Sequence, residues 1–123
     1  MKRITFLLAS LLLVSCCLSQ TITTRFEISK GTQSPPYQEI ISWWQKLDAQ
    51  SGKVKMLTMG MSDAGFPLNL VVVASNGDYN FDNIHQNNKR VILINNGIHP
   101  GEPDGIDASM LLVRDIEIGR AHV

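Results

Sequence analysis

The segment Val91-Ile-Leu-Ile-Asn-Asn-Gly-Ile-His99-Pro-Gly-Glu102-Pro-Asp-Gly105 carries the strongest signal for fold and function in this chain. Its first residues form a continuous apolar run, which is typical of a strand buried on both faces. A glycine-rich turn follows and holds His99 and Glu102 three residues apart, and Pro103 then stands where proline is favoured at the start of a helix. Imidazole and carboxylate are both zinc ligands, so this strand, turn and helix could aim two ligands at one point.

His-x-x-Glu alone is a weak pattern, because a histidine in a turn often lies beside a solvated glutamate without binding a metal. The surrounding residues favour the metal interpretation. Gly97 lies before His99 and Gly101 lies before Glu102, and both allow a tight turn, while Pro100 restricts the loop between the two candidates. We therefore treat His99 and Glu102 as candidate zinc ligands, and side chains on opposite faces of the loop would contradict this.

The stretch Asn96-Gly-Ile-His99-Pro-Gly-Glu102-Pro-Asp-Gly105 resembles the first zinc-binding segment of the carboxypeptidase A-like zinc carboxypeptidases. Residues 37–47 and 55–73 also resemble secreted bacterial members, and the resemblance extends over about residues 21–115. It implies an α/β fold, with a mixed parallel and antiparallel sheet flanked by helices, and zinc bound by His99 and Glu102. The family's third zinc ligand, general-base glutamate and substrate-binding arginine and tyrosine lie farther downstream, so the resemblance assigns no catalytic residue to this chain.

The resemblance implies that the full-length protein is a metallocarboxypeptidase that hydrolyses peptide bonds with Zn²⁺ as cofactor. A peptide or a related amide is then the substrate, and this chain is an inactive N-terminal fragment. Two alternatives stay open. A zinc-dependent deacylase or amidohydrolase of related fold would lack the downstream arginines that bind a free C-terminal carboxylate. An exported binding protein with a decayed catalytic half would lack the downstream zinc-binding histidine.

Residues 1–19 have the pattern of a secretory signal peptide: two basic residues precede a short apolar core, Ile4–Val14, which is too short to span a bilayer. Cleavage after Ser19 would make residue 20 the first of the mature chain. Alternatively, Leu13-Val-Ser-Cys16 resembles a bacterial lipobox and would make Cys16 a lipid-bearing N-terminus. Both interpretations predict export to the periplasm or the extracellular space.

The other end of the chain is expected to be an artefact. Ile118-Gly-Arg-Ala-His-Val123 matches the peptide that a common sequencing adapter encodes in one reading frame. We therefore expect residues 117–123 to be a non-native tail, and we do not count His122 as a zinc ligand. Residues 20–116 remain as the N-terminal part of a zinc carboxypeptidase-like domain.

Composition excludes some partners. The chain has 11 Lys and Arg and 11 Asp and Glu, a formal net charge of +0, and this gives no basic field for nucleic acid or an anionic membrane. Both cysteines, Cys16 and Cys17, lie in the predicted signal peptide, so the mature domain is expected to contain no disulfide. We also expect no transmembrane span in the mature chain.

Hydrophobic spacing predicts a helix after Pro35 that ends near Gln50, following a polar arm at residues 21–34. The apolar stripe of this helix consists of Tyr37, Ile40, Ile41, Trp44 and Leu47. Because Trp44 lies on the stripe, we expect it to be buried, and we expect Trp43 to be partly exposed.

Alternating segments at 53–62 and 68–74 predict a hairpin, since the residues between them favour a turn. Residues 75–89 are rich in Asn and Asp and are expected to form a loop with a solvated His85. Residues 68–74 and 91–95 are both expected to be central strands of the sheet. A helix over residues 103–115 should cover the sheet.

Two acidic residues near the loop, Asp104 and Asp107, have two interpretations. Either could accept a hydrogen bond from the ring of His99 and so orient it, as carboxylates do for metal-bound imidazoles. The stronger interpretation is that acidic residues suit the first turn of a helix because they favour its dipole.

Overall fold

The computed structural model describes residues 22–99 and 101–119. Its elements are α2 (Arg25–Ile28), α3 (Tyr37–Gln50), β1 (Val54–Met61), β2 (Pro67–Val73), α4 (Phe81–Gln86) and α5 (Asp104–Glu117). The predicted signal peptide with Cys16 and Cys17, Pro100, and the end of the tail with His122 lie outside the described residues.

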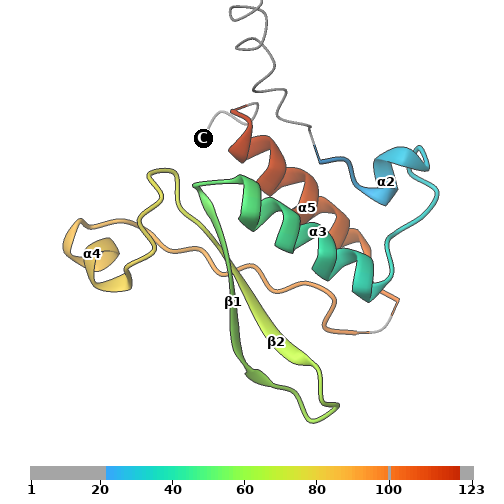
Figure 1. Ribbon diagram of the computed structural model, residues 1–123, viewed down its shortest axis with the longest axis horizontal. Helices are drawn as coiled ribbons and strands as arrows, with labels where there is room; N and C mark the ends of the chain where they lie inside the picture. Colours follow the sequence, from blue (N-terminus) through green and yellow to red (C-terminus); the bar gives the residue numbers. More distant parts are fainter. Residues whose placement is uncertain (1–21, 100, 120–123) are drawn as a thin grey trace, which may run out of the picture.

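The predicted hairpin is confirmed, because β1 and β2 pair antiparallel in the register Val54↔Val73 to Thr58↔Asn69. A register shift follows between Thr58 and Met61, and Ser62 donates its N–H to the carbonyl of Phe66 at 2.8 Å to close the ribbon. The far end of the hairpin, where β1 turns into β2, projects away from the helices (Figure 1).

The core lies where α3 and α5 meet the base of the hairpin. It consists of Trp43, Leu47, Val54 and Met110, which are all almost completely buried. Partly buried apolar residues surround this cluster: Ile22, Ile40, Trp44, Val71, Val73, Ile106 and Val113. The chain is thus an α/β structure with a small core, as its hydrophobic spacing predicts.

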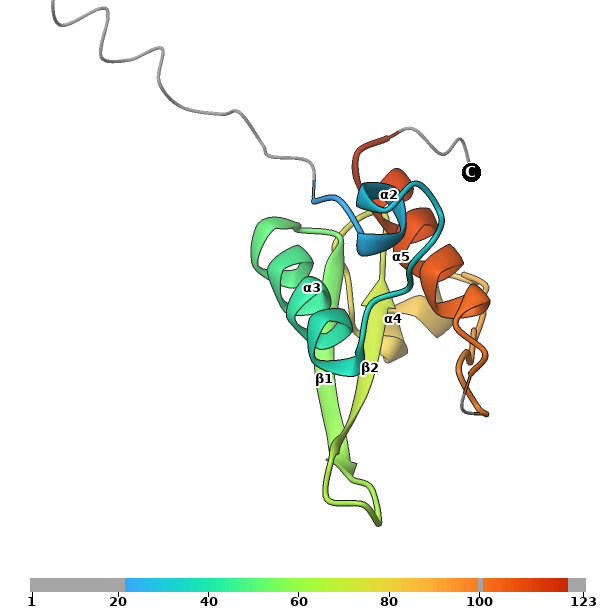
Figure 2. The ribbon, with the colours of Figure 1, turned by 90° about the vertical axis from the view of Figure 1, so that its right-hand side faces the viewer.

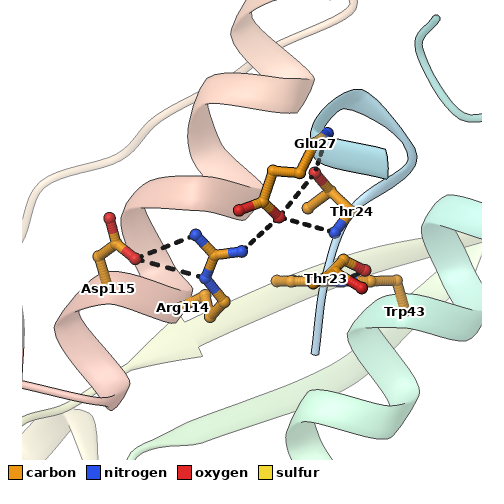
Figure 3. Close-up of polar contacts among 6 residues, drawn as sticks. All are labelled: Thr23, Thr24, Glu27, Trp43, Arg114 and Asp115. Atoms are coloured by element: carbon orange, nitrogen blue, oxygen red, sulfur yellow. Dashed lines mark hydrogen bonds and ion pairs between the residues drawn. The ribbon is translucent and has the colours of Figure 1, made fainter. Parts of the chain in front are cut away.

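The expected burial of the two tryptophans is wrong: Trp43 is buried and Trp44 is half-buried. Trp43 packs in the core and its Nε1–H donates to the carbonyl of Thr23 at 3.2 Å (Figure 3). The helix stripe could not reveal this, because most of the residues around Trp43 lie outside its helix: Val54 in β1, Met110 in α5 and the hydrogen-bond acceptor Thr23 in the arm. The two indole rings meet edge to face, with centroids 4.9 Å apart.

The arm folds back onto α5 through one ionic cluster (Figure 3). Thr24 and Glu27 form a capping box at the start of α2, with the Thr24 N–H donating to Glu27 Oε2 at 2.8 Å. The same carboxylate oxygen accepts a hydrogen bond from Arg114 of α5, whose guanidinium also donates to Asp115 at 3.1 Å. Arg114 is buried, so this cluster supplies the anionic partners that a buried guanidinium requires.

The ionic cluster shifts the pKa values of both Glu27 and Arg114. Burial raises the pKa of Glu27, but hydrogen bonds from Arg114 and Thr24 outweigh it, and the pKa lies below its ordinary value. Burial lowers the pKa of Arg114, but its bonds to Glu27 and Asp115 raise it above the ordinary value. The ionised pair is therefore the favoured state at neutral pH.

The expected central strand at residues 91–95 is wrong for the described chain. The segment is extended (Figure 1) but joins no sheet, and Ile92 and Leu93 are 82% and 80% exposed. An apolar segment becomes a strand only when neighbouring backbone takes its hydrogen-bonding groups, and the only strands paired in the described residues are β1 and β2. The antiparallel part of the expected mixed sheet is present, and residues 22–99 and 101–119 contain no parallel strand pair.

The predicted loop at residues 75–89 contains a short helix, α4. The side chain of Asn80 accepts from the N–H groups of Asp82 and Asn83 and so begins the helix, as asparagine does before a first turn. His85 lies on α4 and is exposed, as expected. In the described part of the chain, no helix has the length and apolar character needed to cross a bilayer.

We predict that Met110→Ala lowers the free energy of unfolding by about 2–5 kcal/mol, because it leaves a cavity in the core. Leu112→Ala, on the same helix but 45% exposed, should cost less than about 1 kcal/mol. Urea unfolding followed by tryptophan fluorescence measures both. Equal losses in the two variants would show that α5 does not pack as described.

We predict that Glu27→Gln lowers the stability at pH 7 by about 1–3 kcal/mol, because the acceptor of the Arg114 hydrogen bond loses its negative charge. The pKa of Glu27 is lowered by folding, so its ionisation stabilises the fold above the ordinary glutamate pKa of about 4.3. This stability is lost as the pH falls through the folded pKa. Urea midpoints at several pH values should therefore converge for the two proteins in acid, and a constant difference would contradict the assignment.

Candidate metal centre

The side chains of His99 and Glu102 face each other in the loop that leads into α5. His99 Nδ1 lies 3.0 Å from Glu102 Oε1, and the side chains are 72% and 61% exposed. The two residues that the sequence singles out are thus in contact on one side of the loop and open to solvent.

Close packing against α5 fixes the start of this loop. Asn96 Nδ2–H donates to Ser109 Oγ at 2.5 Å, and the Asn96 side chain lies directly against Gly105. A Cβ on Gly105 would stand 2.5 Å from Asn96 Oδ1, and one on Gly97 would stand 2.7 Å from Ile106 Cδ1. A Cβ at either position would force the Asn96 or Ile106 side chain to move, so glycine allows the extended segment and the helix to approach this closely.

Two glycines with positive φ shape the turn between segment and helix. Gly97 has φ 65° and Gly101 has φ 86°, a region that other residues rarely adopt. Pro103 follows as the N-cap of α5, and its carbonyl accepts the N–H of Asp107 at 3.0 Å. The helix begins at Asp104, within one residue of the predicted start.

The spacing of the pair suits a metal ion. Two ligand atoms about 2.1 Å from zinc at a near-tetrahedral angle lie about 3.4 Å apart, so a separation of 3.0 Å needs little adjustment. Within residues 22–99 and 101–119, no group of three His, Cys, Asp or Glu side chains comes together. His85 and Asp104 therefore do not complete a site, and the described residues offer the candidate pair His99 and Glu102 alone.

Asp107 lies in the first turn of α5, as the dipole interpretation predicts, but it does not contact His99 and it is buried. It is only 4% exposed, and its Oδ2 accepts a hydrogen bond from Ser34 Oγ in the arm, not from His99. Its Oδ1 is buried and has no hydrogen-bond partner in the part of the chain that the structure describes. Asp104, by contrast, is an exposed first-turn residue, as the dipole interpretation predicts.

Sequence reasoning missed the residues that hold the loop in place. Asn96, Ser109 and Gly105 were part of the quoted motif or its helix, but no spacing rule pairs them. Ser34 lies 73 residues from its partner Asp107.

We predict that Gly105→Ala destabilises the protein, although alanine in a helix is favoured over glycine by about 1 kcal/mol. The added Cβ displaces Asn96 and breaks its bond to Ser109. In an Asn96→Ala background the collision is relieved, so Gly105→Ala should become neutral or stabilising. Urea unfolding of the four proteins measures the cycle, and additive effects would contradict the described contact.

Comparison with known proteins supports the earlier resemblance. The family model described as zinc carboxypeptidase matches residues 40–117, well over half of the chain, and this range includes His99, Glu102 and all of α5. The comparisons with curated proteins and with solved structures each find no match. The matched range runs from the first turn of α3 to the last residue of α5, so it covers the hairpin, the extended segment and the loop. The chain belongs to the zinc carboxypeptidase family.

Proposed function

We propose that the full-length protein is a zinc-dependent metallocarboxypeptidase that hydrolyses peptide bonds, and that His99 and Glu102 are two of its zinc ligands. The observation that carries this proposal is the 3.0 Å approach of His99 Nδ1 to Glu102 Oε1 inside the region matched by the zinc carboxypeptidase model. Membership of the family supports zinc as the cofactor and a peptide as the substrate.

A surface ion pair is the simplest other explanation of the contact. Such a pair contributes only about 0–1 kcal/mol to stability when exposed, so it does not account for a loop with a constrained backbone. Here the loop contains two glycines with positive φ and is packed closely against Ile106 and Gly105. A constrained backbone that holds a histidine and a carboxylate together in solvent is better explained by binding of a cation.

Each residue of the pair has a distinct part in this proposal. Glu102 supplies a negative charge and His99 a neutral ring nitrogen, which together leave a divalent cation with net positive charge. Zinc, when bound, polarises a carbonyl and lowers the pKa of its water to about 7. Because both side chains are mostly exposed, a substrate can reach them from solvent.

Export belongs to the same proposal. The basic residues, short apolar core and small residues within positions 1–19 support a secretory signal, with lipid attachment at Cys16 as the alternative. A carboxypeptidase outside the cytoplasm would act on peptides there. The balanced charge of the chain favours a peptide or amide substrate over nucleic acid.

We predict that the purified chain binds zinc weakly through this pair. Competition with a chromogenic chelator should show the zinc affinity reduced by about tenfold or more in His99→Ala and in Glu102→Gln, since each removes one of two ligands. His85→Ala is the matched control, because His85 lies exposed on α4, and it should bind as the unchanged chain does. Zinc binding that survives His99→Ala would remove the assignment.

The chain by itself should not hydrolyse a peptide with a free C-terminus. The described residues offer two zinc ligands, whereas a catalytic zinc site has three, and the family resemblance places the general base outside these residues. Hydrolysis by this chain that a chelator abolishes would show that the remaining groups are present after all.

A further inference from the structure

The buried face of α5 carries two charged residues, one on each side of a core methionine. Asp107, Met110 and Arg114 are the buried residues of this helix, at the spacing of one helical face. The arm before α3 holds both charges: Glu27 binds Arg114, and Ser34 donates to Asp107. Figure 2 shows that the arm runs from α2, beside α5, to the start of α3.

The contact at Asp107 is chemically different from the one at Arg114. Arg114 has two anionic partners, whereas Asp107 has one hydroxyl donor at Oδ2 and none at Oδ1 in the described chain. A buried carboxylate with so few donors costs stability, and a packed apolar side chain would suit the core better. Stability alone therefore does not explain an aspartate here.

The location of Asp107 indicates what the contact does. Ser34 precedes Pro35, which is buried, and Pro36, which is the N-cap of α3. The Asp107 N–H makes the first helical bond of α5, to Pro103, the residue after Glu102. The Ser34–Asp107 bond thus joins the start of α3 to the turn of α5 that carries the candidate metal loop.

We propose that Asp107, held by Ser34, is a positioning residue that fixes the first turn of α5 and thereby sets the approach of Glu102 to His99. The metal-binding part of this inference rests on the proposed function, but the geometric part does not. Arg114 lies two turns farther along α5 and fixes the helix at its other end. The Glu27–Arg114 contact therefore holds α5 in place, and the Ser34–Asp107 contact orients the loop.

The experiment alters Ser34, because removing the buried carboxylate itself risks unfolding. Ser34→Ala deletes the donor, and Ser34→Thr keeps a hydroxyl that can restore it. Glu27→Gln is the matched control, since it weakens the other contact of the same arm with α5. Variants are compared at temperatures that give equal fractions of folded protein, so a general loss of stability does not enter the comparison.

Two measurements are made on each purified chain. Zinc affinity is obtained by chelator competition, and the nuclear Overhauser effect between the His99 ring and the Glu102 side chain reports their proximity without metal. We expect Ser34→Ala to lose this effect and to bind zinc about tenfold more weakly, the scale found when groups that orient metal ligands are removed. Ser34→Thr should recover both, and Glu27→Gln should change neither.

The outcomes separate this inference from the proposed function. If the unchanged chain does not bind zinc through His99, the proposed metal site fails, and the Overhauser effect alone then decides the positioning role. If Ser34→Ala keeps both the zinc affinity and the effect, the positioning role is refuted while the metal site stands. If Glu27→Gln weakens both as much as Ser34→Ala does, the contact has only a structural role.

Discussion

The fold depends on a buried guanidinium. Arg114 lies on the inner face of α5, where a charge without anionic partners would be strongly destabilising. Asp115 supplies one anionic partner from α5 itself, and Glu27 supplies the other from α2, which brings the arm back across the helices. That return covers Trp43 and brings Ser34 to the start of α5. One electrostatic requirement thus accounts for the closure of a small core that four buried apolar side chains would only marginally stabilise.

Close packing, and not strand pairing, holds the loop with the candidate metal ligands His99 and Glu102. The extended segment before it forms no backbone ladder in the described chain, so its position comes from contacts at its end. Asn96 lies against Gly105 and Gly97 against Ile106, and a Cβ on either glycine would displace the facing side chain. A loop fixed in this way can keep exposed side chains together, because its backbone is constrained even where its surface is open.

Periodicity in the sequence predicts α3, α5 and the hairpin because each depends mainly on contacts between neighbours along the chain. The arm was not predictable in this way, since Glu27 and Arg114 are 87 residues apart. Trp43 was misassigned for the same reason: the group that covers it is not in its helix. For residues 91–95 the apolar run indicates a preference for burial, but pairing requires a neighbour that the pattern cannot specify.

In the candidate site, too, the local contacts could be predicted from the sequence and the contacts between distant residues could not. The approach of His99 to Glu102 is local, because a three-residue step that follows Gly97 and contains Gly101 brings their side chains together, and it could be anticipated. The surroundings of Asp107 are not local. An acidic residue in a first turn is ordinarily explained by the helix dipole, and its burial becomes evident only when Ser34 is placed beside it. A motif therefore identifies the groups able to bind a metal, whereas the residues that orient them come from whichever distant segment packs on the same helix. In this chain that segment is the arm, which ties the geometry of the loop to the ionic cluster at the other end of α5.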